Sequence, residues 1–244
     1  MAKKSLRIEK LVGKAIYDYN LITHNDKILI GISGGRDSFS LLKLLSMRQK
    51  KVPIRYELFP VHIDLGFDDN SSEKIKEYLA KQGFDVIIKK TTIGPMAHSS
   101  YNRENPCFLC SMLRRKALFE IANELGCKKI ALGHHMDDIV ETFFINMIYT
   151  GEISTMVPHQ SLFKGKLSII RPLAYVEKST IDQFANYHHI PSFEDGCKYR
   201  NNSRRNVIKD LIKEMEKKHK KAKRNIFNSM KRVKTEYLLM EHKR

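Results

Sequence analysis

The 244-residue sequence has no apolar stretch near the ~20 residues that a membrane-spanning helix requires. The basic residues of its opening segment, MAKKSLRIEK, are not followed by an apolar run, so no signal peptide is expected there. The sequence also has no internal repeat. Hydrophobic residues make up 42% of the chain and charged residues 29%, which predicts a packed protein and not a disordered one. We expect a cytoplasmic protein without a membrane partner.

Acidic residues are few beside basic ones, with 27 Asp and Glu against 44 Lys and Arg, and the net charge is +17. Residues 198–244 alone hold 17 Lys and Arg but only 5 Asp and Glu, a net charge of +12. One interpretation is a well-solvated surface in a lysine-rich protein, and the other is a polyanionic partner. The concentration of charge in one segment favours a nucleic acid held through its phosphates. Charge alone does not separate RNA from DNA or from an anionic membrane.

Cysteine is scarce as well, with four residues in the chain. In a cytosolic protein disulfides are disfavoured, and a C-x-x-C pair such as Cys107 and Cys110 indicates a metal or redox site. The alternative is two small buried hydrophobic residues. Pro106 before the pair and Arg114-Arg115 after it favour an exposed site that stabilises thiolates.

The two remaining cysteines have different expected roles. Cys197 lies in a predicted loop and is a candidate third ligand, whereas Cys127 begins a predicted buried strand and is expected to pack in the core. Three ligands do not close a tetrahedral zinc site. They suit a [4Fe–4S] cluster with one iron left open, which could present hydrosulfide to a substrate.

Short apolar segments alternate with helical segments along the first three quarters of the chain. Strands are expected at 27–33, 55–67, 84–93, 127–135 and 167–175, and helices at 5–22, 37–50, 71–83, 110–126 and 137–151. Ser71 is expected to cap its helix and Gly83 to end it. This alternation predicts an α/β fold whose parallel sheet is covered by helices on both faces.

The string I-S-G-G-R-D-S (32–38) stands between a predicted strand and a predicted helix. Gly34 and Gly35 allow the backbone to approach an anion closely, and the following helix N-terminus adds N–H donors and positive potential. Ser33 and Ser38 add hydroxyl donors. The chain lacks the G-K-[ST] of a Walker A motif here. A plain tight turn would also need glycine, but the full string in this context favours a phosphate loop.

This string resembles the signature of the PP-loop ATP pyrophosphatases, which cut ATP between the α and β phosphates and transfer AMP to an acceptor. The resemblance implies that Ser33, Gly34, Gly35 and Ser38 hold pyrophosphate. It also implies that Asp37 binds Mg²⁺ or polarises the phosphates.

Three further segments match that family. V-H-I-D-L-G (61–66) nominates Ile63 and the neighbouring Gly31 for backbone contacts to adenine, and R-P-L (171–173) closes the fifth strand. G-H-H-M-D-D (133–138) would put Gly133 beside the nucleotide and Asp138 at the reacting phosphates. We assign no proton-transfer role to His134 or His135. Ligands at the carboxyl ends of parallel strands agree with the expected architecture.

Four features together resemble the tRNA 2-thiocytidine synthetases over about residues 10–235: the C-x-x-C before a basic helix, G-H-H-x-D-D, R-P-L-A-Y and a late single cysteine. The resemblance implies that Cys107, Cys110 and Cys197 ligate a [4Fe–4S] cluster and that Arg114 lies near the substrate. It implies tRNA as a partner, with sulfur from a donor such as a cysteine desulfurase or from free sulfide.

The sequence departs from that pattern at Arg36, where lysine is usual, and at Arg200, which leaves Cys197 without a C-x-x-C companion. The uridine-thiolating relatives usually carry zinc-binding cysteine pairs at both ends. This chain has none, which favours the cytidine branch. R-N-N-S-R (200–204) resembles an Arg-Asn-x-x-Arg element of tRNA-modifying relatives, with a solvated helix start as the equally weighted alternative.

The resemblance predicts an N-terminal helix over 1–23, a PP-loop ATP-binding domain over 24–176 and a basic helical, tRNA-binding region over 177–244. The expected function is ATP-dependent replacement of the O2 atom of a tRNA cytidine, at anticodon-loop position 32, with sulfur. The alternatives are uridine 2-thiolation, a cluster-free tRNA-adenylating enzyme such as a lysidine synthetase, a non-catalytic redox module, and an ATP-independent desulfurase. The oligomeric state is left open, with a homodimer as one arrangement.

Overall fold

The computed structural model describes residues 2–67, 70–103, 105–193, 197 and 204–239. Contacts divide the chain into two compact units, one of Met1–His135 with Val157–Asn201 and one of Met136–Met156 with Asn202–Arg244. No helix in the described part of the chain is long and apolar enough to cross a membrane. The limits of these units differ from the predicted domain boundaries at 23/24 and 176/177. The helix Lys178–Tyr187 belongs to the first unit, and the helix Met136–Tyr149 belongs to the second.

A six-stranded sheet forms the centre of the first unit, in the order β3-β2-β1-β4-β6-β5. The strands are β1 (Asp26–Ile32), β2 (Tyr56–Asp64), β3 (Ile87–Lys90), β4 (Lys129–Ala131), β5 (His159–Leu162) and β6 (Leu167–Ile170). All neighbouring pairs are parallel except β5 with β6. The predicted α/β fold with a parallel sheet is therefore confirmed, with one antiparallel edge strand in addition.

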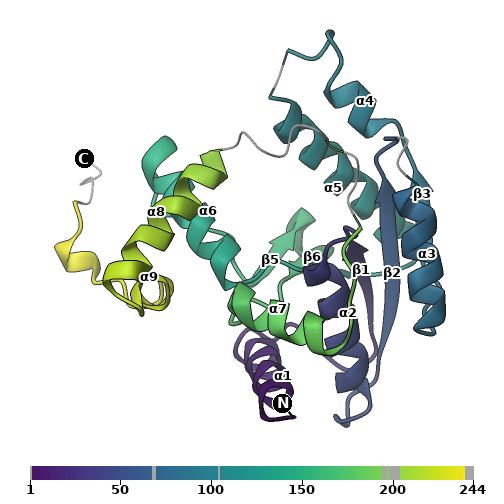
Figure 1. Ribbon diagram of the computed structural model, residues 1–244, viewed down its shortest axis with the longest axis horizontal. Helices are drawn as coiled ribbons and strands as arrows, with labels where there is room; N and C mark the ends of the chain where they lie inside the picture. Colours follow the sequence, from purple (N-terminus) through teal and green to yellow (C-terminus); the bar gives the residue numbers. More distant parts are fainter. Residues whose placement is uncertain (1, 68–69, 104, 194–196, 198–203, 240–244) are drawn as a thin grey trace. The chain divides into compact units, whose positions relative to one another are not determined.

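Helices cover both faces of this sheet. On one face α1 (Ala2–Asp18), α2 (Arg36–Gln49) and α7 (Lys178–Tyr187) pack against one another, and α2 also packs on β1 and β2 (Figure 1). On the other face α5 (Pro106–Glu124) packs against β2 and β4. The first unit also holds α3 (Ser71–Lys81), the short α4 (Ile93–Ala97) and the 3₁₀ turn η1 (Phe163–Gly165).

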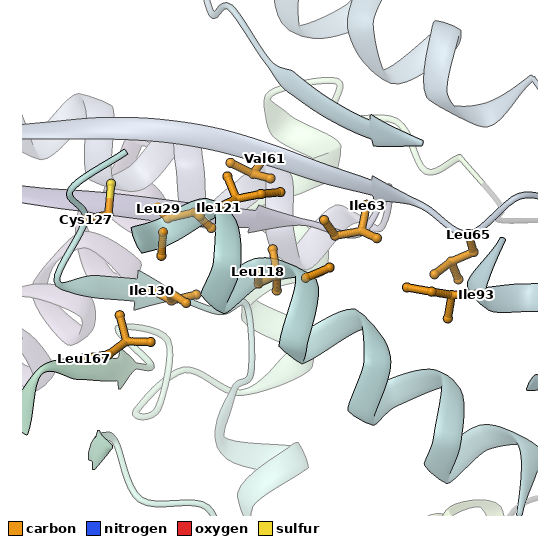
Figure 2. Close-up of a cluster of buried hydrophobic side chains, with 12 residues drawn as sticks. Leu29, Val61, Ile63, Leu65, Ile93, Leu118, Ile121, Cys127, Ile130 and Leu167 are labelled. Carbon is orange, nitrogen blue, oxygen red and sulfur yellow. The ribbon is translucent and has the colours of Figure 1, made fainter. Parts of the chain in front are cut away.

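The core under α5 is built from aliphatic side chains. Figure 2 shows Leu118 and Ile121 of α5 beside Leu29, Val61 and Ile130, which come from three neighbouring strands. All five are at most 8% exposed. Cys127 belongs to the same cluster and is 3% exposed, which confirms its expected place in the core. Burial of this continuous apolar layer is the main stabilising contribution to the sheet.

The ends of α3 follow the sequence signals only in part. Gly83 has a φ of 80° just past the end of α3, as expected of a helix-terminating glycine. The expected cap at Ser71 is wrong, because Asn70 precedes the helix with a φ of 52° and Ser71 is buried in its first turn. Asparagine adopts this left-handed conformation more readily than serine, which explains the one-residue shift.

The second unit consists of helices. It contains α6 (Met136–Tyr149), α8 (Arg204–Lys218), α9 (Ala222–Ser229) and the 3₁₀ turn η2 (Thr235–Tyr237). Each of α6, α8 and α9 packs against the other two. Ile208, Ile212 and Phe227 are the buried residues of α8 and α9, and most positions of α8 are exposed.

Candidate functional site

Strand order reverses between β1 and β4, because the chain builds outward from β1 to β3 on one side and through β6 on the other. In open α/β sheets, ligands bind at the carboxyl ends of the strands where such a reversal occurs. The loop after β1 holds the S-G-G string, and the segment after β4 holds Gly133. The topology therefore places the expected phosphate loop at the position where this class of fold binds ligands.

The loop after β1 is closed by hydrogen bonds among its own residues. Ser38 Oγ donates to the Gly35 carbonyl at 2.8 Å, and the Ser33 amide donates to Ser38 Oγ at 3.2 Å. The Gly35 amide donates to Ser33 Oγ at 3.4 Å. Gly34 has a φ of 81°, a conformation that favours glycine. The four predicted pyrophosphate ligands thus lie together at the start of α2.

Gly133 lies against the same loop. A Cβ atom at this position would lie 3.1 Å from the Asp37 carbonyl carbon and 3.1 Å from the Ser38 amide nitrogen. The end of β4 therefore approaches the first turn of α2 so closely that a side chain would crowd it. Gly133, which the sequence predicts to lie beside the nucleotide, therefore lies next to the phosphate loop.

Gly31 and Ile63, the proposed adenine contacts, lie on the adjacent strands β1 and β2. A Cβ atom at Gly31 would lie 2.9 Å from the Leu132 side chain, so this strand position is also crowded. The Ile63 side chain is 4% exposed and belongs to the core under α5. Any contact of Ile63 with a nucleotide would therefore be made by its backbone, as predicted.

Asp37 forms an ion pair that the sequence did not reveal. Lys178 Nζ, on the first residue of α7, lies 2.5 Å from Asp37 Oδ1 and 3.0 Å from Asp182 Oδ1. His135 Nε2 lies 3.7 Å from Asp37 Oδ2. Burial by itself would raise the pKa of Asp37, but the contacts with His135 and Lys178 outweigh burial and lower it. The loop carboxylate is thus held in its charged form.

Lys178 keeps its charge for the same reason. Burial would lower its pKa, but the carboxylates of Asp37 and Asp182 outweigh this and raise it. No motif marked Lys178 in the sequence, because it meets Asp37 only through the packing of α7 on α2. The first unit therefore has a fixed positive charge directly beside the expected phosphate loop.

Arg171, of the R-P-L segment after β6, is buried with 4% exposure. Its guanidinium donates to the Val157 carbonyl at 2.6 Å, to Gln160 Oε1 at 3.2 Å and to His134 Nδ1 at 3.4 Å. Because its N–H groups point at these partners, Arg171 braces the segments at the ends of β4 and β6. It does not present a charged surface to a large partner.

Asp138 lies in the second unit, in the first turn of α6. Arg205 of α8 contacts its carboxylate at 3.2 Å and that of Glu141 at 3.6 Å. Next to it Lys223 of α9 lies 2.8 Å from Asp137 and 3.0 Å from Glu216. Within this unit the acidic first turn of α6 is therefore neutralised by cations of α8 and α9.

The C-x-x-C pair occupies the first turn of α5. Pro106 is the first helical residue, and Asn105 caps the helix by accepting a hydrogen bond from the Phe108 amide at 3.1 Å. Cys107 is exposed and Cys110 is half-buried, one turn further along the helix. Arg114 is half-buried one more turn along. Cys107, Cys110 and Arg114 thus stand on successive turns of α5, with Cys110 packed against the core, and their roles at a cluster stay predictions.

The other two cysteines differ from each other in accessibility. Cys197 is half-buried, whereas Cys127 is buried. Burial raises the pKa of the Cys127 thiol to about 11. Cys127 is therefore a poor thiolate donor. Among the described residues, no three His, Cys, Asp or Glu side chains lie close enough together to hold a metal ion. The set of Cys107, Cys110 and Cys197 stays a prediction.

The basic C-terminal segment is exposed where the structure describes it. Lys217 and Lys218 end α8, and Lys220 and Lys221 follow in the connection to α9. All four side chains are exposed, although Lys217 also pairs with Glu214 at 2.5 Å. Arg200 and most of the R-N-N-S-R element lie outside the described residues.

The family model and the relatives of similar sequence both indicate a PP-loop protein. The family model of the PP-loop domain matches residues 3–215. A tRNA-cytidine(32) 2-sulfurtransferase of Syntrophotalea carbinolica is 37% identical over 212 residues, which cover 86% of this chain and 82% of that protein. The tRNA-cytidine(32) 2-sulfurtransferase of Geotalea daltonii is 35% identical over 237 residues, 96% of this chain and 94% of that protein.

Among solved structures, the U34-tRNA thiolase NcsA from Methanococcus maripaludis, determined with its [4Fe-4S] cluster, superimposes with a TM-score of 0.81. The superimposed region covers 99% of this chain and 82% of the NcsA chain, and the sequences are 23% identical. At this level of identity the likeness establishes a shared fold.

Proposed function

The chain belongs to the PP-loop domain family and to the tRNA sulfurtransferases within it, and we propose that it uses ATP to replace O2 of a tRNA cytidine with sulfur. The cytidine at anticodon-loop position 32 is the proposed target. The observation that carries the proposal is the loop after β1, where the S-G-G backbone, the Asp37–Lys178 pair and Gly133 meet at the strand-order reversal.

In the proposed first step, O2 of the cytidine attacks the α-phosphorus of ATP, and pyrophosphate leaves. The loop amides and the start of α2 would accept the leaving pyrophosphate, because a helix N-terminus stabilises negative charge. Gly133, packed against the first turn of α2, and Gly31, packed against Leu132, would offer backbone contacts to the nucleotide beside the strand ends. The step turns O2 of the base into part of an adenylate, which is a far better leaving group than the original oxygen.

Asp37 and Lys178 would set the electrostatics of this step. The Asp37 carboxylate is a hard oxygen donor and would hold the Mg²⁺ that accompanies ATP. Lys178, held beside it by Asp182, would offset the negative charge that develops on the phosphate oxygens. Asp138 is our second candidate for a residue that acts at the phosphates.

In the proposed second step, sulfur at the oxidation level of sulfide attacks C2 of the adenylated base. AMP leaves with the former O2 atom, and loss of a proton gives the thiocarbonyl. Exposed Cys107 and half-buried Cys110, one turn apart on α5, suit an iron–sulfur cluster, with Cys197 as the proposed third ligand. Such a [4Fe–4S] cluster would supply a site for hydrosulfide, which would come from free sulfide, or from the persulfide of a cysteine desulfurase after its two-electron reduction by thiols. Arg114 would attract the phosphates of the tRNA toward these thiols.

Mass spectrometry of tRNA nucleosides from cells that lack the protein tests the proposal. Loss of 2-thiocytidine, restored by the wild-type gene but not by an Asp37→Asn variant, is the expected result. Unchanged 2-thiocytidine would contradict the proposed substrate. Loss of a 2-thiouridine would instead move the activity to the uridine branch. Formation of pyrophosphate that requires tRNA and ATP, and release of AMP that requires sulfide in addition, would separate this enzyme from a redox module or an ATP-independent desulfurase.

A further inference from the structure

Both carboxylate oxygens of Asp37 face a basic side chain of the protein itself. Lys178 Nζ lies 2.5 Å from Oδ1, and His135 Nε2 lies 3.7 Å from Oδ2. Mg²⁺ binds its oxygen ligands at about 2.0–2.1 Å in an octahedral arrangement. Because the two oxygens belong to one small group, a metal ion on either of them would lie close to the Lys178 ammonium and repel it. The carboxylate therefore cannot keep its close contact with Lys178 and bind Mg²⁺ at the same time.

Of the two partners, the lysine is the one that is free to move. Asp37 stands in the first turn of α2, a helix whose next residues are buried. The adjoining loop is held by two further contacts, in which the Arg36 guanidinium donates to Asn186 Oδ1 at 3.0 Å and the Phe193 amide donates to the Gly34 carbonyl at 2.9 Å. A lysine ammonium, in contrast, ends a flexible four-carbon stem. Binding of a metal ion would thus leave Asp37 in place and displace the ammonium.

Asp182 offers the displaced ammonium a second partner. It follows Lys178 by four residues on α7, and its Oδ1 lies 3.0 Å from Lys178 Nζ. The side chains of Lys178 and Asp182 are 38% and 41% exposed, so solvent leaves room for the ammonium to shift. A lysine that leaves Asp37 but stays with Asp182 would remain beside the phosphate loop.

We propose that Lys178 occupies the metal position of Asp37 in the nucleotide-free protein and exchanges this position for the phosphates when Mg²⁺ and ATP bind together. The inference rests on the proposed function, in which Asp37 holds the Mg²⁺ of ATP. It adds an order to binding. A free divalent ion must displace the ammonium without compensation, whereas a nucleotide brings phosphate oxygens that bind both the metal ion and the displaced lysine. The site thereby favours the metal–nucleotide pair over the metal ion alone.

The first measurement is the affinity of the full-length, nucleotide-free protein for Mn²⁺, followed by electron paramagnetic resonance. Mn²⁺ is the probe because it takes the same oxygen ligands as Mg²⁺. Lys178→Met removes the competing ammonium and should bind Mn²⁺ about fivefold more tightly than the wild type. Lys178→Arg keeps the charge and should bind no more tightly than the wild type.

The matched control is Lys14→Met. Lys14 pairs with Asp18 four residues on in α1, at 2.9 Å, so its loss also removes one positive charge and uncovers one carboxylate. This variant should leave the affinity for Mn²⁺ unchanged. An equal gain in Lys14→Met and Lys178→Met would assign the effect to net charge and overturn the exchange.

The second measurement is calorimetry with α,β-methylene-ATP, which resists cleavage between the α and β phosphates, in the presence of Mg²⁺. Loss of a charged contact to the phosphates should weaken binding to Lys178→Met about tenfold, whereas Lys178→Arg should keep most of the affinity. The two measurements therefore predict changes of opposite sign in the same variant. A lysine that served only to stabilise the fold would produce losses in both, because an unfolded variant cannot gain affinity for a metal ion.

The outcomes separate this inference from the proposed function. If the wild type binds no nucleotide with Mg²⁺, the proposed function fails and the exchange fails with it. If the wild type binds the nucleotide but Lys178→Met shows unchanged or weaker Mn²⁺ binding, the exchange is overturned while the proposed function stands. A variant that binds both Mn²⁺ and the nucleotide more tightly would also overturn it, since Lys178 would then have no contact with the phosphates.

Discussion

At the scale of single residues, the negative charge of Asp37 in the phosphate loop is compensated by neighbouring side chains. A charged carboxylate beside a bound polyphosphate would repel it, and burial would strengthen that repulsion. Lys178 at 2.5 Å and His135 at 3.7 Å compensate this charge in the absence of ligand. The arrangement keeps Asp37 ionised, as a Mg²⁺ ligand must be, without leaving its charge uncompensated.

We predict that Asp37→Asn abolishes the formation of AMP while tRNA binding is largely kept. The amide retains the size of the side chain but loses the charge that would bind Mg²⁺ and hold Lys178. Production of AMP and pyrophosphate in the presence of tRNA measures the effect, and a gel-shift assay with the same tRNA is the control. Undiminished ATP cleavage by the variant would remove Asp37 from the mechanism.

A second residue-scale prediction concerns the thiols. Changing Cys107, Cys110 or Cys197 to Ala should in each case remove the visible absorbance of an iron–sulfur cluster in anaerobically purified protein, together with thiolation. Cys127→Ala is the control, because this residue is 3% exposed in the core. It should cost about 1–2 kcal/mol of stability and leave the absorbance intact. A cluster that needs Cys127 and tolerates loss of Cys197 would show that the predicted ligand set is wrong.

The sequence was informative at this scale wherever the signal was local. Ser33, Gly34, Gly35 and Ser38 stand in one short string whose composition is required by the backbone conformation and the expected ligand. Lys178 and Phe193 carry no such signal, because each reaches the loop from a distant element through tertiary packing. The arginine of R-P-L was visible as a motif, but its burial and its role as a brace follow only from its three hydrogen-bond partners.

At the scale of elements, the strands with continuous apolar runs were predictable and the short polar ones were not. β1 matches its predicted range of 27–33 to within one residue because both of its faces are covered, whereas β2 ends three residues before the predicted limit of 67. β5, with the sequence HQSL and alternating exposure, has no apolar run and forms only because β6 offers an edge for antiparallel pairing. The five-residue α4 was missed for a similar reason, since its formation depends on packing against α5.

The three helices of the second unit are joined by a charge network that a variant can test. Lys223 and Asp137 are only 16% and 14% exposed, so Lys223→Met should destabilise this unit by about 2 kcal/mol through loss of the ion pairs of Lys223 with Asp137 and Glu216. Faster hydrogen exchange of the α9 amides measures the effect. Lys213→Met is the matched control, because the exposed Lys213–Asp210 pair should contribute less than about 1 kcal/mol.

The pH dependence of this network has a defined sign. Burial would lower the pKa of Lys223, but Asp137 and Glu216 outweigh burial and raise it above 10.5. Its contribution to stability is therefore complete below pH 10.5 and is lost as the pH rises through the higher pKa of the folded state. Equal exchange rates for wild type and Lys223→Met at neutral pH would contradict a stabilising role.

At the scale of the whole molecule, charge is distributed unevenly between the parts of the chain. Residues 198–244 hold a net charge of +12 out of +17, and α8 and α9 expose most of their basic side chains. A surface of this kind binds polyphosphates by releasing counterions, with little regard to sequence. The alternative is that these lysines form a solvated helix face and that tRNA lies instead on Arg114, Arg115, Arg171 and Arg200. Arg171 is buried and therefore cannot offer its charge to tRNA. Arg200 lies outside the described residues, which leaves Arg114 and Arg115 as the arginines that this alternative requires.

We predict that replacing Lys217, Lys218, Lys220 and Lys221 together by Gln weakens tRNA binding and flattens its dependence on salt. Four lost phosphate contacts would reduce the slope of log affinity against log salt by up to about 3, and by less if the Lys217–Glu214 pair already competes with one contact. ATP binding should survive, because the phosphate loop belongs to the other unit. The control replaces four exposed lysines of the first unit, Lys74, Lys76, Lys81 and Lys89, and should leave the slope nearly unchanged. Titrations of tRNA at several salt concentrations decide the matter, since an equal slope for wild type and the C-terminal variant would assign the tRNA contacts to Arg114 and Arg115 instead.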